Sequence, residues 1–224
     1  MSDRRLIIWD VDGTLVDSRA AITHAMRRAF ASEALPYPGD AAVIARVGLS
    51  LETLMAGLVP EAPERGPALA TAYRRAFRSR REALGSLATA PFFPGVREAL
   101  AQIRAMPDTV MAIATGKSRR GLTSLIAEHG LDGWFVSMHC ADDHPGKPDP
   151  SMIRAVLSDT GLPAHRAVMV GDTGFDMEMG RAAGVATLGV GWGFQPPERL
   201  DADRIVTRPD DLAAAVLALT GEIA

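Results

Sequence analysis

The chain has 224 residues, 47% of them hydrophobic, which is enough to bury a sizeable core in one large domain or in a domain that carries an inserted module. Its 27 acidic and 24 basic side chains give a net charge of −3, so the chain has no overall positive field with which to hold a nucleic-acid backbone. Cys140 is the single cysteine, which excludes an intramolecular disulfide and favours a reducing compartment.

The first apolar run, Leu6 to Trp9, predicts a strand that is buried on both faces. After it, the interval from Asp17 to about Pro91 contains only helical patterns. These patterns cover Ser18 to Ala34, Asp40 to Val47, Leu51 to Leu58 and about Pro67 to Leu87. A helical insertion at this position is expected to form a small domain over the strand ends. We therefore predict an all-helical cap domain of residues 17–91, with residues 1–16 and 92–224 forming the catalytic core.

Five more apolar runs follow the cap and alternate with helical segments. They are Thr109 to Ala114, Trp134 to Met138, Ala167 to Val170, Ala186 to Val190 and, more weakly, Arg204 to Val206. Helices are expected to begin near Pro94-Gly95, Ser118 and Pro150. This alternation favours right-handed crossovers and a parallel sheet with helices on both faces. The sequence therefore predicts an α/β fold with a Rossmann-like three-layer core.

Two aspartates, Asp10 and Asp12, stand at the end of the first predicted strand. Residues two apart in a strand point to the same side, and open α/β sheets bind their ligands beyond the carboxyl ends of the strands. Two close carboxylates repel each other unless one is protonated or a cation lies between them. The pair therefore indicates a divalent metal, a proton donor, or both.

Three further polar segments follow later strands. They are Thr115-Gly116-Lys117, Gly146-Lys147-Pro148-Asp149-Pro150 and Gly171-Asp172-Thr173-Gly174-Phe175-Asp176. Because the carboxyl ends of parallel strands lie along one edge of a sheet, these segments should converge with the aspartates of the first strand. The converging set would contain a hydroxyl, an ammonium and several carboxylates.

Together and in this order, DVDGT, ATGK, GKPDP and GDTGFD resemble the four motifs of the haloacid dehalogenase-like superfamily. The resemblance is to its phosphatase branch with a helical cap after the first motif, and it covers essentially the whole chain. It implies that Asp10 is the nucleophile and forms an aspartyl-phosphate. It also implies that Asp12 protonates the leaving alcohol and then activates water as a base.

The resemblance further implies a Mg²⁺ ion held by Asp10, the main-chain carbonyl of Asp12 and Asp172. Thr115 and Lys147 would act on the phosphoryl oxygens as catalytic and substrate-binding residues. Asp176 would support the metal site or orient Lys147.

Gly116, which we place among the substrate-binding residues, stands where many capped relatives have Asn. This side of the pocket is therefore expected to differ from theirs. Arg46 and Ser50 are candidates for contacting the substrate, because they belong to a loop between cap helices that reaches the active site in similar proteins. A purely structural role of this loop is equally compatible with the sequence.

Other polar clusters suggest less specific roles. A basic run on the long cap helix, Arg74 to Arg81, is typical of a solvated face, with attraction of an anionic substrate as the alternative. The cluster from His139 to His144 matches no standard zinc spacing. An EF-hand loop is excluded, because such a loop needs glycine sixth and glutamate twelfth, where this chain has Leu15 and Ala21. Trp192 and Phe194 could be core, pocket rim or interface.

The sequence therefore predicts a Mg²⁺-dependent phosphatase that hydrolyses a small phosphomonoester such as a phosphoglycolate-like metabolite. The alternatives are a phosphosugar mutase of the beta-phosphoglucomutase type, a pyrophosphatase and a non-catalytic phosphate-binding module. The apolar run near the start is too short for the core of a signal peptide, and no later segment approaches a membrane span. We expect a cytoplasmic monomer or homodimer that binds a small phosphorylated metabolite and neither nucleic acid nor membrane.

Overall fold

The computed structural model describes residues 4–221, and these contain a six-stranded parallel sheet in the order β3-β2-β1-β4-β5-β6. The strands are β1 (Arg5–Trp9), β2 (Thr109–Thr115), β3 (Ser137–Cys140), β4 (Ala167–Gly171), β5 (Ala186–Val190) and β6 (Arg204–Val206). The predicted α/β class is confirmed. Strand β1 lies inside the sheet between β2 and β4, so the residues that follow it stand at the middle of the carboxyl edge.

The third strand begins later than the sequence predicts. Its apolar run starts at Trp134, but the strand starts at Ser137. Trp134 belongs to a turn, where its N–H donates a 3.0 Å hydrogen bond to the carbonyl oxygen of Leu131. Trp134 and the buried Phe135 pack against the core from this turn. The prediction of a strand at Trp134 was therefore wrong, because these apolar side chains reach the core from a loop.

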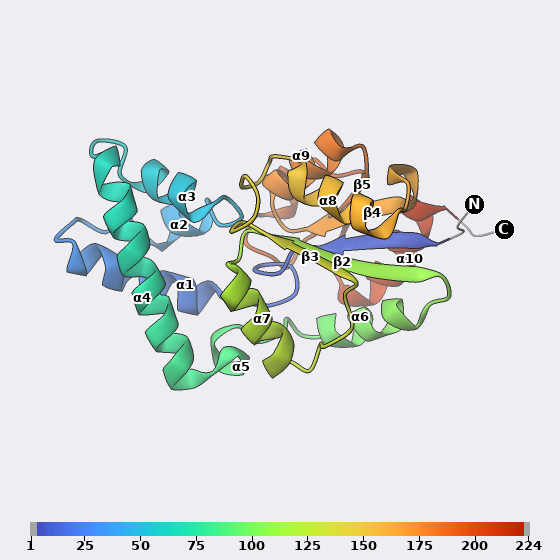
Figure 1. Cartoon of the computed structure of the whole chain (residues 1–224), viewed down its shortest axis with the longest axis horizontal. Coiled ribbons are helices and arrows are strands. Elements are labelled where there is room, and N and C mark those ends of the chain that lie inside the picture. Colours follow the sequence, from blue (N-terminus) through green and yellow to red (C-terminus); the bar gives the residue numbers. More distant parts are fainter. Residues whose placement is uncertain (1–3, 222–224) are drawn as a thin grey trace.

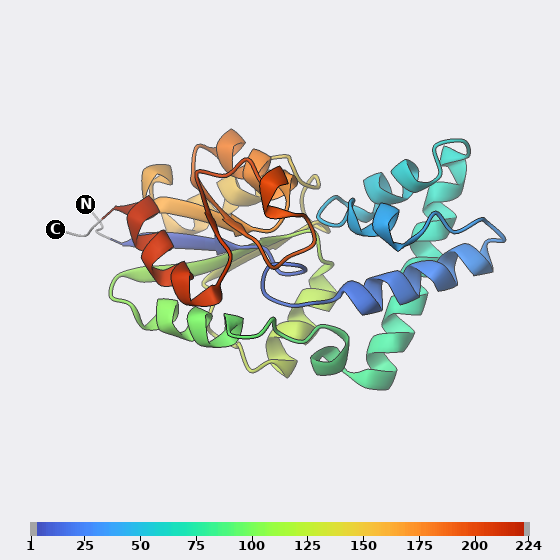
Figure 2. The same ribbon diagram turned by 180° about the vertical axis from the view of Figure 1, so that it is seen from behind.

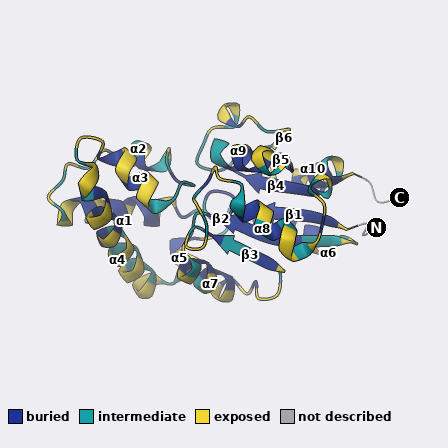
Figure 3. Ribbon diagram, turned by 45° about the horizontal axis from the view of Figure 1, so that its top comes forward, coloured by how far each residue is buried: buried dark blue, intermediate teal, exposed yellow. Residues whose placement is uncertain are grey.

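Helices cover both faces of the sheet (Figure 1). One face is covered by α6 (Val96–Ala105), α7 (Arg119–Glu128) and α10 (Leu212–Thr220), and the other by α8 (Ser151–Thr160) and α9 (Gly174–Ala183). Alternate residues of β1 serve the two layers, with Ile7 in one apolar cluster and Ile8 in the other. The inner strands β1, β2, β4 and β5 are accordingly buried along most of their length, whereas the edge strands β3 and β6 are less buried (Figure 3). Within residues 4–221, no helix combines the length and apolar character needed to cross a membrane.

Five helices between β1 and β2 gather beyond the carboxyl edge of the sheet (Figures 1 and 2). They are α1 (Arg19–Ser32), α2 (Asp40–Ile44), α3 (Leu51–Leu58), α4 (Gly66–Leu84) and α5 (Ser86–Thr89). Apolar side chains of α1 to α4 form a cluster separate from the two clusters on the sheet. The predicted long helix ends at Leu84, because Gly85 has a φ of +78° that does not continue a right-handed helix.

The two segments that connect these helices to the sheet lie side by side. Val16 forms an isolated antiparallel bridge with Phe92, and the N–H of Asp17 donates a 2.8 Å hydrogen bond to the carbonyl oxygen of Pro91. We keep residues 17–91 as the proposed cap domain, since this pairing falls at its two ends.

Candidate active site

Asp10 lies directly after β1, where its N–H donates a 2.9 Å hydrogen bond to the carbonyl oxygen of Val170. Its carboxylate is buried, and Oδ1 lies 2.6 Å from Nζ of Lys147. The same Nζ lies 2.6 Å from Oδ1 of Asp176. One buried ammonium therefore joins the end of β1 to the start of α9, as the convergence of parallel strand ends predicts.

Asp176 is fixed by the first turn of α9. Its Oδ2 accepts hydrogen bonds from the N–H of Thr173 at 3.0 Å and from the Thr173 hydroxyl at 2.7 Å. This is a capping box, in which the N-cap residue and the third helical residue satisfy each other's polar groups. Because one oxygen serves the helix cap and the other meets Lys147, Asp176 is held in a position to orient that lysine.

Asp172 follows β4 and is completely buried. Its Oδ1 accepts a 3.0 Å hydrogen bond from the hydroxyl of Thr14, and its Oδ2 accepts a 2.7 Å hydrogen bond from the N–H of Phe194. Two glycines make room for it. A Cβ added at Gly13 would lie 2.2 Å from Oδ2, and one added at Gly193 would lie 2.2 Å from the Cβ of Asp172. Sequence reasoning missed the supporting roles of Thr14, Gly193 and Phe194.

The negative charges of these buried carboxylates are only partly neutralised by nearby positive charge. Burial raises the pKa of Asp10 to about 6, although the Lys147 ammonium opposes the shift. Burial, together with the charges of Asp10 and Asp176, raises the pKa of Asp172. Burial alone would lower the pKa of Lys147, but the carboxylates of Asp10 and Asp176 raise it above its ordinary value. The site is thus a buried region of negative charge with one permanent cation.

Asp10, Asp172 and Asp176 could hold a metal ion, because each offers a carboxylate oxygen and these atoms lie within 4.8 Å of one another. Three carboxylates against one ammonium leave two negative charges, which a divalent cation would neutralise. Oxygen ligands of this kind suit Mg²⁺. The residues present therefore fit the predicted metal.

Asp12 directs its carboxylate to Lys117 instead of to the acidic group. Both carboxylate oxygens of Asp12 lie 2.9 Å from Nζ of Lys117. Across from them on α4, the ring centroid of Phe77 lies 5.6 Å from the same Nζ. Burial and the charge of Asp12 raise the pKa of the neighbouring Tyr73. The ATGK motif contains Lys117, but its partner could not be inferred, because packing across the cleft sets the direction of its long side chain.

Two core glycines let the cap loop of residues 47–50 approach the sheet. A Cβ added at Gly116 would lie 2.9 Å from the carbonyl oxygen of Gly48, and one added at Gly146 would lie 2.6 Å from the Cβ of Ser50. An Asn at position 116 would therefore require this loop to move. Glycine is needed at position 116 because the cap loop lies too close for a side chain.

The two cap residues predicted to contact substrate have other partners. Nη1 of Arg46 donates a 3.0 Å hydrogen bond to the carbonyl oxygen of Ala42, and its Nε lies 3.0 Å from the position of a Cβ at Gly57. The Ser50 hydroxyl accepts a 3.3 Å hydrogen bond from the N–H of Thr53 and caps α3. The structure brings neither side chain to the acidic group.

A cleft of about 650 Å³ separates the cap from the strand ends. Asp10, Asp12 and Thr115 lie on its core side, and the Thr115 hydroxyl accepts a 3.3 Å hydrogen bond from the N–H of Lys117. Gly116 lies on the same side. The cap side includes several arginines of α4. They are Arg74, Arg78 and Arg81.

The chain is thus an α/β protein with a buried acidic group at the carboxyl edge of a parallel sheet and a group of helices beyond that edge (Figure 1). The family described as haloacid dehalogenase-like hydrolase matches residues 7–190. The chain belongs to this family, and the resemblance found in the four motifs is confirmed.

Individual relatives agree with this assignment. The chain is 35% identical over 201 residues to the probable phosphatase IndB of Dickeya dadantii, which covers 88% of this chain and 85% of that protein. It is 31% identical to the phosphoglycolate phosphatase of Pseudomonas savastanoi pv. phaseolicola, over 85% of this chain and 70% of that protein. The crystal structure of a predicted phosphatase from Clostridium acetobutylicum has the same fold, with a TM-score of 0.85 at 20% identity over 96% of this chain and 99% of that one.

Proposed function

We propose that this chain is a Mg²⁺-dependent phosphatase that hydrolyses a small phosphomonoester through an aspartyl-phosphate on Asp10. The observation that carries the proposal is the buried contact of 2.6 Å between Asp10 and Lys147, beside two further carboxylates. A phosphoryl group in transfer spreads negative charge over its oxygens, so a fixed cation next to the nucleophile stabilises the transition state. When bound, Mg²⁺ would supply further positive charge to those oxygens.

The proposed chemistry divides the hydrolysis between two carboxylates. A carboxylate oxygen of Asp10 attacks phosphorus while the bond to the leaving oxygen breaks, and Asp12 donates a proton to that oxygen. Asp12 then accepts a proton from water, which attacks phosphorus and releases inorganic phosphate and free Asp10. Because Lys117 engages both oxygens of Asp12, one oxygen must turn to the leaving group before Asp12 can donate its proton, while Lys117 holds the other.

The remaining predicted residues hold the phosphoryl group. In the proposal, Thr115 and Lys147 bind its oxygens, and Asp176 keeps Lys147 in place. Gly116 leaves its main chain open to the cleft, and Ser50 stabilises the cap loop above it. Closure of the cap would exclude bulk water, and opening would release the product.

For the substrate, we propose a leaving group that itself carries a carboxylate, as in phosphoglycolate. Arg78 and Arg81 line the cap side of the cleft, and within residues 4–221 neither forms an ion pair. Guanidinium groups recognise carboxylates through paired hydrogen bonds. Arg74, in contrast, is already paired with Glu52. Relatives named phosphoglycolate phosphatase support the same choice.

The first experiment measures inorganic phosphate released from a panel of small phosphomonoesters that includes phosphoglycolate, with Mg²⁺ or with a chelator. We expect release that depends on Mg²⁺ and that falls by roughly 10³ or more in Asp10→Asn, because the nucleophile is lost. The absence of release from every compound would contradict the phosphatase proposal. Transfer of phosphate between two positions of one sugar would favour a mutase.

A second experiment tests the substrate class. The variant Arg78→Gln/Arg81→Gln should raise KM for phosphoglycolate by about tenfold or more, and it should change KM little for a phosphomonoester with an uncharged leaving group. An equal rise in KM for both compounds would show that the arginines do not recognise the leaving group.

A further inference from the structure

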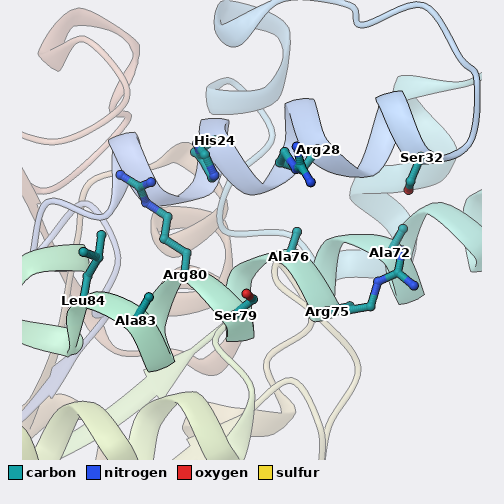
Figure 4. A pocket seen from close by; sticks show the side chains of 10 residues that line it. All are labelled: His24, Arg28, Ser32, Ala72, Arg75, Ala76, Ser79, Arg80, Ala83 and Leu84. Carbon is teal, nitrogen blue, oxygen red and sulfur yellow. The ribbon is translucent and has the colours of Figure 1, made fainter.

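The cap carries a second hollow, between α1 and α4, on a different side of α4 from the cleft (Figure 4). Its volume is about 570 Å³, within the range of small-molecule sites. Polar side chains from both helices line it. They are His24, Arg28 and Ser32 from α1, and Arg75, Ser79 and Arg80 from α4. We call this hollow the α1–α4 groove.

Helical geometry divides the basic run of α4 between two sites. Residues three, four or seven apart lie on one face of a helix. Arg74, Arg78 and Arg81 have this spacing and line the cleft. Arg75 and Arg80, which are five residues apart, line the groove instead. Arg74, Arg75 and Arg78 are exposed, as a solvated face predicts, and the groove arginines are not explained by the active site.

The positive charge of the groove has no partner in the described part of the chain. Other cap arginines form ion pairs, for example Arg27 with Asp40. Within residues 4–221, Arg28, Arg75 and Arg80 form none, and the groove lining contains no carboxylate.

Arg80 is the groove arginine with an unsatisfied buried donor. Its Nε is shielded from water and has no hydrogen-bond partner, which is costly for a cationic donor. Figure 4 shows its side chain crossing from α4 towards α1 near His24. Burial lowers the pKa of His24, and the charges of Arg80, Arg28 and Arg27 lower it further. A positive field thus acts across the groove on the imidazole.

We propose that the α1–α4 groove binds a small anion with several negative charges, such as an oligophosphate or a polycarboxylate. Three guanidinium groups from two helices offer more donors than one monovalent anion can accept, and the two serine hydroxyls extend the set. Such a ligand would pair with terminal guanidinium nitrogens of the groove arginines and would join α1 to α4 from outside the cleft. The groove is thus a binding site that is separate from the phosphatase chemistry.

Calorimetric titration of the metal-free full-length chain with tripolyphosphate, and separately with citrate, tests the proposal at low ionic strength. Arg75→Gln/Arg80→Gln should weaken binding of at least one anion at this site by about tenfold or more, because two charge-assisted contacts are lost. Arg78→Gln/Arg81→Gln removes the same charge from the cleft side of the same helix and should leave that binding event intact. Comparison of the two anions shows whether phosphate or carboxylate groups are preferred.

Two results would overturn the proposal. One is that Arg75→Gln/Arg80→Gln binds both anions as tightly as the natural chain. The other is that Arg78→Gln/Arg81→Gln abolishes all binding, which would place the anion only in the cleft. Arg75→Lys/Arg80→Lys keeps the charge and should retain most of the binding, so that a loss confined to the Gln variant reports the charge rather than a damaged cap.

A second readout comes from the His24 imidazole, whose ring protons can be followed by NMR. Bound anion should offset the repulsion from Arg80 and Arg28 and raise the pKa of His24. The shift should be absent in Arg75→Gln/Arg80→Gln. An imidazole titration that is unchanged by saturating anion in the natural chain would also contradict the site.

Discussion

Lys117 belongs to the ATGK motif, and the structure gives it a partner that the motif does not predict. It lies 2.9 Å from both oxygens of Asp12 and stacks near Phe77 on the cap. It therefore connects the proposed proton donor to the cap helix. We infer that Lys117 positions Asp12 for each cycle and does not touch the reacting phosphorus.

Substitution Lys117→Met tests this role. We expect kcat for phosphate release to fall by roughly tenfold, less than the 10²–10⁴ that general acid–base catalysis contributes, because Asp12 remains but is less well placed. Lys117→Arg should restore most of the activity. A kcat equal to that of the natural chain in Lys117→Met would contradict the inference.

Gly193 leaves room for the side chain of Asp172. A Cβ there would lie 2.2 Å from the Cβ of Asp172 and 2.5 Å from its Oδ2. Gly193→Ala should therefore displace Asp172 and weaken Mg²⁺ binding by about tenfold or more, with loss of phosphate release. Calorimetric titration with Mg²⁺ measures the first effect, and a phosphate assay the second.

Gly174→Ala is the matched control for that experiment. The nearest atom to a Cβ at Gly174 is 3.7 Å away, which is an ordinary contact, so Mg²⁺ binding should be unchanged. Equal Mg²⁺ affinity in both alanine variants would show that Asp172 tolerates the crowding at Gly193.

At the scale of elements, the cap loop of residues 47–50 is the part of the cap that approaches the sheet closely. It rests against Gly116 and Gly146, and both glycines immediately precede or follow predicted site residues. The phosphate pocket and the cap are thus in direct contact through main-chain atoms. A side chain at either glycine should displace the cap loop and should affect the reaction itself less.

Gly116→Asn should separate the loop from the core, because the added Cβ would meet the carbonyl oxygen of Gly48 at 2.9 Å. We expect a higher KM and faster amide hydrogen exchange in residues 47–51, with a smaller change in kcat. Gly133→Asn is the control, because a Cβ at Gly133 meets nothing within 4 Å and Asn tolerates its φ of +73°. Unchanged exchange and KM in Gly116→Asn would show that the cap loop accommodates the side chain.

Several elements were predictable because their signals are local. Ser118 accepts the hydrogen bond from the N–H of Gly121 that caps α7, and the predicted bounds of α3 agree with the structure. The gathering of Asp10, Lys147 and Asp172 was also predictable, since parallel strands end along one edge. The start of β3, the pairing of Lys117 and the direction of Arg46 were not, because each depends on contacts between distant segments.

For the molecule as a whole, three buried carboxylates beside a single ammonium predict that the free energy of unfolding depends on Mg²⁺. A ligand at 100 times its Kd stabilises the folded state by about 2.7 kcal/mol. For a chain of this size, that corresponds to a rise in Tm of roughly 5 to 10 °C. Asp172→Asn should lose most of this rise, because one of the three carboxylates is removed. Thermal unfolding with Mg²⁺ or chelator measures it, and an undiminished rise in the variant would exclude Asp172 as a ligand.

Asp172→Asn also tests how the free energy of unfolding of the metal-free chain depends on pH. Burial and nearby carboxylates raise the pKa of Asp172 in the folded state, so the folded state holds this proton more tightly than the unfolded state. Below the unfolded value of about 3.9, the group costs no stability, and as pH rises above it, stability is progressively lost. Asp172→Asn carries no such loss. The free energy of unfolding of the variant should therefore exceed that of the natural chain more at pH 7 than at pH 4.

The central place of β1 in the sheet has a consequence for the order of assembly during synthesis. Arg5 pairs with Thr109 of β2, and Leu6 pairs with Ala167 of β4. Strand β1 therefore emerges before the proposed cap, receives β2 only after the cap and α6, and receives β4 only after most of the core has been made. The cap has its own apolar cluster and can gather earlier. Asp172 is synthesised immediately after β4, the second neighbour of β1. A nascent chain that stops before β4 therefore lacks Asp172 and Asp176, so Asp10, the proposed nucleophile, cannot reach its acidic surroundings until the segment after β4 has been made.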